Sequence, residues 1–178
     1  MFLNIAICDD ELSEIKTIED YIITFSVQSG IEFKVNKYTN GNKLLSSYNG
    51  NPSKYDVIFL DVEMPEINGI EIAEQIRKIP DRNVLIVFIT SYPEYMQDSF
   101  DVQAYQYLTK PLTYDLFEDK MKRLIGYLNE LQTNIAVISL KNVEIILHLD
   151  DIICFETIKS ITTKSDLLVT TVNDEFAI

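Results

Sequence analysis

The chain has 178 residues, of which 47% are hydrophobic and 24% charged, so it has room for one globular domain and part of another. Its formal net charge of −13 excludes nucleic-acid binding through the surface as a whole. The start has no basic signal-peptide region, and the longest apolar run, 84–89, is too short to span a bilayer, so we expect a cytoplasmic protein without a membrane partner.

The first 130 residues alternate between strand and helix patterns. Strands are expected at 2–8, 31–38, 57–60, 84–89 and 104–108, and most of their cores are continuous apolar runs typical of a parallel sheet. Helical spacing of apolar residues follows each strand, at 15–25, 41–48, 69–79, 93–100 and 113–132. This alternation predicts an α/β fold with a doubly wound five-stranded parallel sheet.

The pattern changes near residue 131. Residues 131–136 are the predicted linker between a first domain, 1–130, and a second segment, 137–178. Strand-like runs without helical spacing lie at 135–140, 143–149, 152–158 and 167–172, which predicts an all-β segment. Cys8 and Cys154 lack metal-site spacing and are expected to be reduced, buried thiols, and His148 is expected to be a solvated strand residue.

Polar side chains stand at the ends of four predicted strands. Asp9 and Asp10 follow the first strand, Asp61 the third, Thr90 ends the fourth, and Lys110 follows the fifth. The carboxyl ends of parallel strands meet at one sheet edge, so we expect these residues to converge. Carboxylates without His or Cys favour a hard ion such as Mg²⁺, beside which a carboxylate can attack a phosphoryl group. The Lys110 ammonium and the Thr90 hydroxyl would then bind phosphoryl oxygens.

Taken singly, these residues have ordinary explanations. Asp9 and Asp10 could cap a helix, Lys110 and Pro111 could belong to a plain loop, and Tyr107 could be a packed strand residue. The acids, the Thr90 hydroxyl and the Lys110 ammonium together fit a carboxylate nucleophile at Asp61 that attacks a phosphoryl group beside Mg²⁺.

Four motifs resemble the receiver domain of two-component response regulators. They are Ile7-Cys8-Asp9-Asp10-Glu11, Leu60-Asp61-Val62-Glu63-Met64-Pro65 with Asn68-Gly69, Ile89-Thr90-Ser91, and Tyr107-Leu108-Thr109-Lys110-Pro111. The resemblance covers about residues 1–130 and implies a flavodoxin-like fold. It also implies a signalling domain that takes its phosphoryl group from a histidine kinase and is not an enzyme beyond slow autodephosphorylation.

The same resemblance implies a role for each site residue. Asp61 would be the phosphoacceptor, and Asp9, Asp10, Asp61 and the backbone carbonyl of Glu63 would hold Mg²⁺. Thr90 and Tyr107 would be the switch residues, Lys110 the phosphate partner, and Pro111 would follow a cis bond. Phosphorylation would promote a homodimer through the fourth helix, fifth strand and fifth helix.

The all-β segment is similar to the start of a LytTR-type DNA-binding domain, most clearly at Asp151-Ile152-Ile153-Cys154-Phe155-Glu156. This similarity implies control of transcription. The segment is shorter than an ordinary domain, and from Asn134 onward it carries three lysines against seven acids, a net charge of −4, whereas a DNA-contacting surface is basic. We therefore expect a truncated output domain, and no DNA-binding residue is assigned.

Two other functions stay open. The chain could be a binding module that sequesters a partner through receiver pairing without contacting DNA. A phosphatase of the haloacid-dehalogenase type also uses an Asp nucleophile with Mg²⁺, but it places that residue in an Asp-x-Asp motif at the first strand. Here the candidate nucleophile, Asp61, lies on the third strand and is followed two residues later by Glu63.

Overall fold

The structure is a computed structural model. It describes the backbone of residues 2–51, 54–79, 84–133, 135–140, 143–148, 152–159, 165–171 and 175–177, and the side chains of 2–51, 54–79 and 84–131. The chain divides into two compact units, residues 1–119 and 120–178, and each is described by itself.

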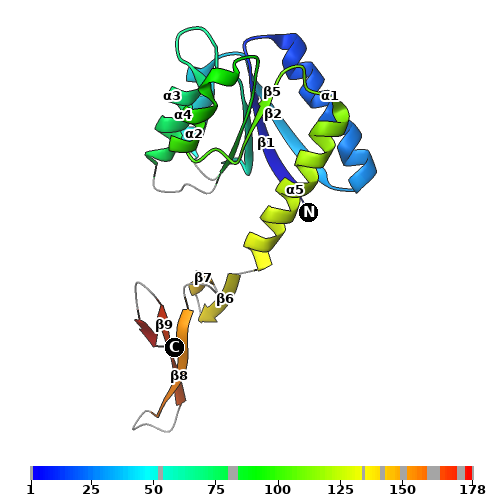
Figure 1. Ribbon diagram of the computed structural model, residues 1–178. Helices are drawn as coiled ribbons and strands as arrows, with labels where there is room; N and C mark the ends of the chain where they lie inside the picture. Colours follow the sequence, from blue (N-terminus) through cyan, green and yellow to red (C-terminus); the bar gives the residue numbers. More distant parts are fainter. Residues whose placement is uncertain are drawn as a thin grey trace. The chain divides into compact units, whose positions relative to one another are not determined.

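A five-stranded parallel sheet in the order β2-β1-β3-β4-β5 forms the centre of the first unit (Figure 1). The strands are β1 (Phe2–Cys8), β2 (Glu32–Tyr38), β3 (Val57–Leu60), β4 (Leu85–Thr90) and β5 (Gln106–Thr109). Cys8 pairs with Leu60, and Thr90 pairs with Thr109. The prediction of a doubly wound parallel sheet is confirmed, and this register brings the residues that follow β1, β3 and β5 to one edge.

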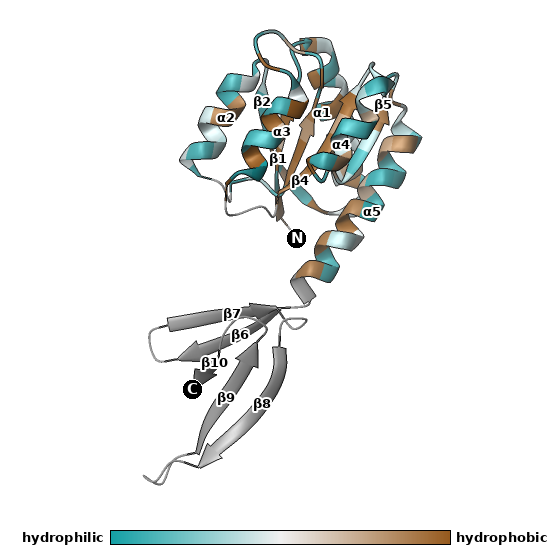
Figure 2. Ribbon diagram, turned by 60° about the vertical axis from the view of Figure 1, so that its left-hand side comes forward, coloured by the Kyte–Doolittle hydropathy of each residue, from teal (hydrophilic) through white to brown (hydrophobic). Residues whose placement is uncertain are grey.

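Helices cover both faces of this sheet. They are α1 (Leu12–Ser29), α2 (Gly41–Gly50), α3 (Gly69–Arg77), the 3₁₀ turn η2 (Pro93–Tyr95), α4 (Met96–Asp101) and α5 (Tyr114–Thr133). Figure 1 shows α1 and the start of α5 on one face and α2, α3 and α4 on the other. Phe59 of β3 packs against Phe117 of α5, with ring centroids 5.8 Å apart. Figure 2 shows hydrophobic colour concentrated on β1 and β4, between helices with hydrophilic outer faces.

Short polar side chains begin three of these helices. The side chain of Asn40 accepts a hydrogen bond from the Lys43 backbone, and that of Asn68 accepts one from Glu71. The hydroxyl of Thr113, the residue before α5, accepts one from the Leu116 backbone at 3.4 Å. Each bond satisfies a backbone N–H that has no partner inside the helix. The polar residues seen in the sequence therefore set where these helices start.

The segment after β4 differs from its prediction. Pro93 begins a 3₁₀ turn, and the α-helix that follows has six residues. Met96 and Phe100 are 41% and 72% exposed, and the buried residue of α4 is Ser99. So short a helix packs little of its surface on the sheet, and its large apolar side chains therefore face outward. Leu131, near the end of α5, is also exposed.

Arg77 joins the end of α3 to two chain segments beside it. Its guanidinium donates to the carbonyls of Val102 at 2.8 Å, Val84 at 3.0 Å and Gln103 at 3.2 Å. We expect Arg77→Met to lower the free energy of unfolding by about 2 kcal/mol, because it leaves partly buried carbonyls without this donor. Urea unfolding measures the loss. Lys78→Met removes a charge from the adjacent exposed residue and should be close to neutral; equal losses in both variants would contradict the prediction.

The second unit contains the remainder of α5 and five strands. These are β6 (Ile135–Leu140), β7 (Val143–His148), β8 (Ile152–Lys159), β9 (Ser165–Thr171) and β10 (Glu175–Ala177). β6 pairs antiparallel with β7, and β9 pairs antiparallel with β8 and β10. Most of the predicted linker thus falls inside α5 and β6. The side chains of His148 and Cys154 lie outside the described residues. Among the helices that the structure describes, none is both long and apolar enough to cross a membrane.

Candidate functional site

Four of the predicted site residues meet at the carboxyl edge of the sheet. The Lys110 Nζ lies 2.7 Å from Asp9 Oδ2 and 2.9 Å from Asp61 Oδ2. Carboxylate oxygens of Asp9, Asp10 and Asp61 lie within 4.8 Å of one another. Residues at positions 9, 61 and 110 are separated widely in the chain, and the parallel register brings them together. The predicted convergence of these charged groups is therefore observed.

Burial strengthens the interactions inside this cluster. Asp9 and Asp61 are 1% and 7% exposed, whereas Asp10 is exposed. Burial raises the pKa of Asp9 above its ordinary value, although the hydrogen bond from Lys110 opposes this. Burial alone would lower the pKa of Lys110, but its hydrogen bonds to Asp9 and Asp61 raise it above the ordinary value. Lys110 is therefore a cation at neutral pH, held between two carboxylates.

Backbone contacts fix the direction of the two buried carboxylates. Asp61 Oδ1 accepts a hydrogen bond from the Val62 backbone at 2.7 Å, and Asp9 Oδ1 accepts one from Glu11 at 2.9 Å. Gly69, the first residue of α3, donates to the Val62 carbonyl at 2.7 Å. A Cβ at position 69 would lie 2.1 Å from the Asp61 carbonyl oxygen, so only glycine fits at this approach. Gly69 therefore allows the loop after β3 to pack directly on α3.

A polar cavity of about 460 Å³ opens over the cluster. It is lined by Asp10, Glu11, Glu14, Asp61, Glu63, Ser91, Tyr92, Lys110 and Pro111. The Lys110–Pro111 peptide bond is cis. Glu14 lies 3.9 Å from Lys110 and was not predicted, although its position four residues after Asp10 in the first turn of α1 was a usable signal. The cavity gives small anionic molecules access to Asp61.

Thr90 and Tyr107 both contact Tyr92. Thr90 is fully buried, and its Oγ1 accepts a hydrogen bond from the Tyr92 backbone at 3.4 Å. The Tyr107 hydroxyl donates to the Tyr92 carbonyl, and burial raises its pKa to about 12, with Glu94 adding to the effect. Thr90 and Tyr107 are not among the described residues that line the cavity. They are thus linked to each other through the backbone that follows β4.

The donor set fits a hard divalent cation. The three carboxylates supply oxygen ligands only, and the exposed Asp10 makes the cluster reachable from solvent. Cys8 precedes Asp9, but it is not a competing soft ligand. Burial raises the pKa of its thiol to about 12, and the protonated thiol lies 3.7 Å from the Met64 sulfur. The residues present therefore fit Mg²⁺ better than a thiolate-binding metal.

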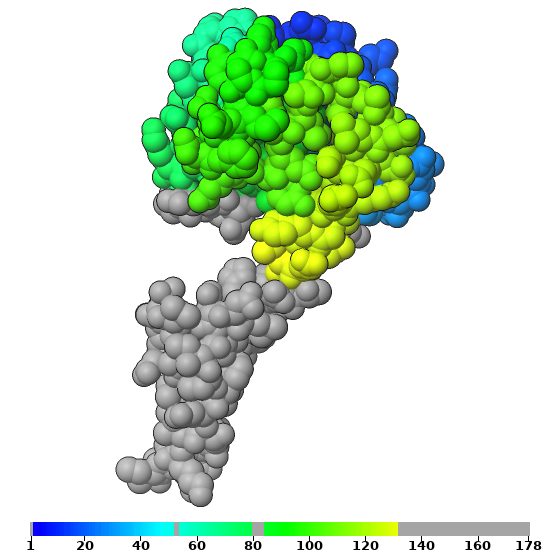
Figure 3. All heavy atoms as spheres, in the orientation of Figure 1, coloured from blue at the N-terminus to red at the C-terminus, as the bar shows by residue number. Residues whose placement is uncertain are grey.

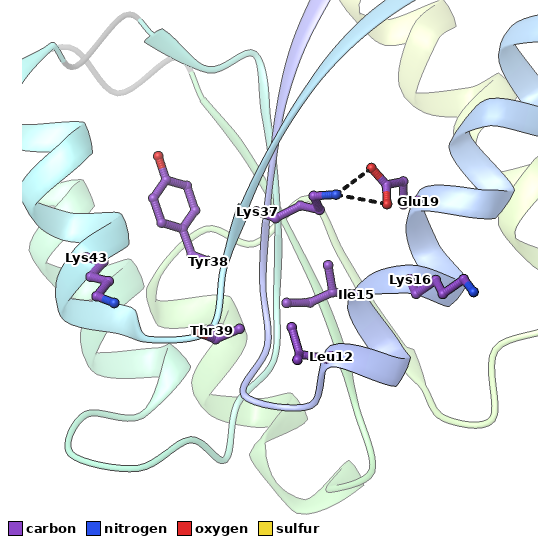
Figure 4. A pocket seen from close by; sticks show the side chains of 8 residues that line it. All are labelled: Leu12, Ile15, Lys16, Glu19, Lys37, Tyr38, Thr39 and Lys43. Atoms are coloured by element: carbon purple, nitrogen blue, oxygen red, sulfur yellow. Dashed lines mark hydrogen bonds and ion pairs between the residues drawn. The ribbon is translucent and has the colours of Figure 1, made fainter.

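A second cavity of about 410 Å³ lies between the start of α1, the end of β2 and the start of α2. Figure 4 shows Leu12 and Ile15 near Thr39, with Lys37 directed toward Glu19. The Lys37–Glu19 ion pair measures 2.9 Å. None of the predicted site residues lines this cavity, so the chemistry expected from the sequence belongs to the cavity over Asp61.

Part of the chain is similar to proteins whose names describe signal transduction or regulation. The chain is 44% identical over 87 residues to the sensory transduction protein LytT of Oceanobacillus iheyensis, covering 48% of this chain and 34% of that protein. It is 39% identical over 69 residues to the transcriptional regulatory protein BtsR of Salmonella typhi, covering 39% of this chain and 28% of that one. The matched stretches thus span about a third of these relatives.

Solved structures of response regulators are similar to a large part of the chain. The response regulatory domain of mrkE from Klebsiella pneumoniae has a TM-score of 0.64 at 25% identity, covering 72% of this chain and 99% of that one. The response regulator TrrA of Thermotoga maritima, solved in complex with Mg²⁺ and a beryllium fluoride, has a TM-score of 0.57 at 28% identity, covering 68% of this chain and 98% of that one. Residues 5–122 match the sequence model of the response regulator receiver domain, and the chain therefore belongs to the response regulator family.

Proposed function

We propose that Asp61 accepts a phosphoryl group from a sensor histidine kinase, and that the chain relays this signal to a transcriptional output. The observation that carries the proposal is the contact of one ammonium, Lys110, with the carboxylates of both Asp61 and Asp9 at the floor of an accessible cavity. A buried carboxylate with a fixed cation beside it is suited to forming a phosphate anhydride.

In the transfer step, an oxygen of Asp61 forms a bond to phosphorus while the bond from phosphorus to the donor nitrogen breaks. The imidazole leaves with that electron pair, and the Lys110 ammonium stabilises the charge on the phosphoryl oxygens. Asp9, Asp10, Asp61 and the Glu63 backbone carbonyl would hold Mg²⁺, which neutralises charge on the transferring group. The result is a phosphorylated signalling domain with slow autodephosphorylation rather than a turnover enzyme.

The response passes from Asp61 to α4 through Tyr92. A phosphoryl group on Asp61 recruits the Thr90 hydroxyl, which then gives up its hydrogen bond with the Tyr92 backbone. Tyr107, bound to the carbonyl of the same residue, repacks inward. Phosphorylation thereby shifts a pre-existing equilibrium between two conformations. Thr90 and Tyr107 thus act as switch residues, although neither lines the described part of the cavity.

The output surface is formed by α4, β5 and the start of α5, where two phosphorylated copies pair. Figure 3 shows α4 (green) at the surface of the first unit. Phe100 is 72% exposed, Met96 and Tyr92 are each 41% exposed, and Leu116 is 39% exposed. Exposed apolar side chains are suited to a protein partner. The name of BtsR supports control of transcription, and the similarity to LytT favours a LytTR-type output domain. DNA contact by that domain is part of the proposal, and receiver pairing without DNA contact is the alternative.

Mass spectrometry after incubation with phosphoramidate and Mg²⁺ tests the phosphoacceptor. We expect one hydroxylamine-labile phosphoryl adduct on the wild-type protein and none on Asp61→Asn. Asp56→Asn is the matched control, because Asp56 precedes the same strand at its other end and bonds the Asn4 backbone. An adduct that persists in Asp61→Asn would refute the assignment. Turnover of small phosphoesters by that variant would instead indicate a phosphatase with another active site.

A further inference from the structure

One contact beside the phosphoacceptor is not used by the proposed relay. The hydroxyl of Tyr95 donates a hydrogen bond to Glu63 Oε1 at 2.5 Å, and so links the loop after β3 to the start of α4. The ring of Tyr95 is half-buried against the hydrophobic core of the first unit. The donor therefore has a well-defined position.

The charge of Glu63 matters because the cavity is already strongly acidic. Its lining carries five acids, namely Asp10, Glu11, Glu14, Asp61 and Glu63, against the single cation Lys110. Every phosphodonor that reaches Asp61 carries negative charge and has to enter this field. Charges at the mouth of a cavity change association rates strongly, and the effect depends on ionic strength. The position of the exposed Glu63 side chain therefore affects the rate at which a phosphodonor enters the cavity.

The hydrogen bond from Tyr95 fixes the position of the Glu63 carboxylate. Among the described residues, Tyr95 is outside the cavity lining whereas Glu63 is part of it. The bond thus directs Glu63 Oε1 toward a side chain that does not line the cavity. Without the hydroxyl, an exposed glutamate samples several rotamers, including those that bring its carboxylate over the cavity. Tyr92, whose ring centroid lies 6.5 Å from that of Tyr95, belongs to the cavity lining.

We propose that Tyr95 is a positioning residue that holds the Glu63 carboxylate at the cavity rim and so speeds entry of anionic phosphodonors to Asp61. The inference rests on the proposed function of Asp61 and assigns a role to a residue outside the motifs of the site. Tyr95 acts through Glu63 and does not itself contact the reacting atoms. Its effect should therefore vanish when Glu63 carries no charge.

The test compares rates of adduct formation from phosphoramidate at saturating Mg²⁺ in the wild type, Tyr95→Phe, Glu63→Gln and the double variant. We expect Tyr95→Phe to slow uptake about threefold to tenfold at low ionic strength, because a mobile carboxylate repels the donor. High salt should remove most of this difference. In the Glu63→Gln background, loss of the Tyr95 hydroxyl should have no effect on the rate.

Tyr114→Phe is the matched control. It also removes a tyrosine hydroxyl that donates to a side chain, that of Gln28 at 2.6 Å, and it should retain the wild-type rate. A wild-type rate for Tyr95→Phe overturns the inference, as does a slowing that persists at high salt or in the Glu63→Gln background. If the wild-type protein itself forms no adduct, the proposed function of Asp61 fails; if it does and Tyr95→Phe matches it, only the role of Tyr95 fails.

Discussion

Lys110→Met should lower the free energy of unfolding of the metal-free protein at pH 8 by about 3 kcal/mol. Lys110 Nζ contacts Asp9 at 2.7 Å and Asp61 at 2.9 Å, and the two carboxylates are almost fully buried. Removing the cation leaves both negative charges in a poorly solvated site with no opposite charge between them. Urea unfolding without metal measures the loss directly.

The pH dependence of this loss follows from the pKa of Asp9. Burial already raises that pKa, and the hydrogen bond from Lys110 opposes the rise, so the variant should show a larger increase. An acid whose pKa is raised in the folded state binds more protons in that state than in the unfolded state. The free energy of unfolding therefore falls as the pH rises from the unfolded-state pKa through the folded-state pKa. The difference in free energy of unfolding between variant and wild type should therefore be largest at pH 8. It should shrink as the pH is lowered toward the pKa of an unfolded aspartate.

Addition of Mg²⁺ provides the second part of this test. A cation bound to the three carboxylates stabilises the folded state by mass action, and it does so more strongly when no ammonium competes for the same oxygens. We expect a larger rise in melting temperature with Mg²⁺ for Lys110→Met than for the wild type. A variant that is as stable as the wild type at pH 8 without metal would contradict the account of the cluster.

Gly69→Ala should damage both stability and phosphoryl uptake. The added Cβ would lie 2.1 Å from the Asp61 carbonyl oxygen and 3.0 Å from the Val62 Cα, and both are backbone atoms that cannot rotate away. Relief of this clash has to move the loop after β3 or the start of α3. We expect a loss of about 2 to 3 kcal/mol in the free energy of unfolding. Because the moved backbone carries Asp61, uptake from phosphoramidate should fall by about 10- to 100-fold.

Gly126→Ala is the matched control for this substitution. Gly126 lies in α5. Outside its own helix neighbourhood, no heavy atom of the residues that the structure describes is within 4 Å of the position that its Cβ would take. Alanine has a higher helix propensity than glycine, so this variant should be more stable by up to about 1 kcal/mol and should take up phosphoryl groups at the wild-type rate. Similar losses in both variants would show that the clash at Gly69 is not their cause.

The sheet could be predicted from the sequence because each strand has a local signal. The run 57–60 and the run 85–89 are apolar throughout, and strands β3 and β4 that contain them are buried on both faces in the structure. Their order in the chain, with a helix after each, leaves few possible topologies. The segment from Pro93 to Asp101 was less predictable, because a short helix at the surface leaves little periodicity to detect.

The convergence of Asp9, Asp61 and Lys110 could be predicted from the sequence, because each residue follows a strand and parallel strands end at one edge of the sheet. The tertiary structure decided how they meet: Lys110 lies between Asp9 and Asp61, and Tyr95 reaches Glu63 from the start of α4. The sequence shows neither which carboxylate oxygens Lys110 contacts nor that Tyr95 reaches Glu63, because both depend on how loops are folded over the sheet. Strand ends are set by local periodicity, whereas partners among side chains are set by packing between distant segments.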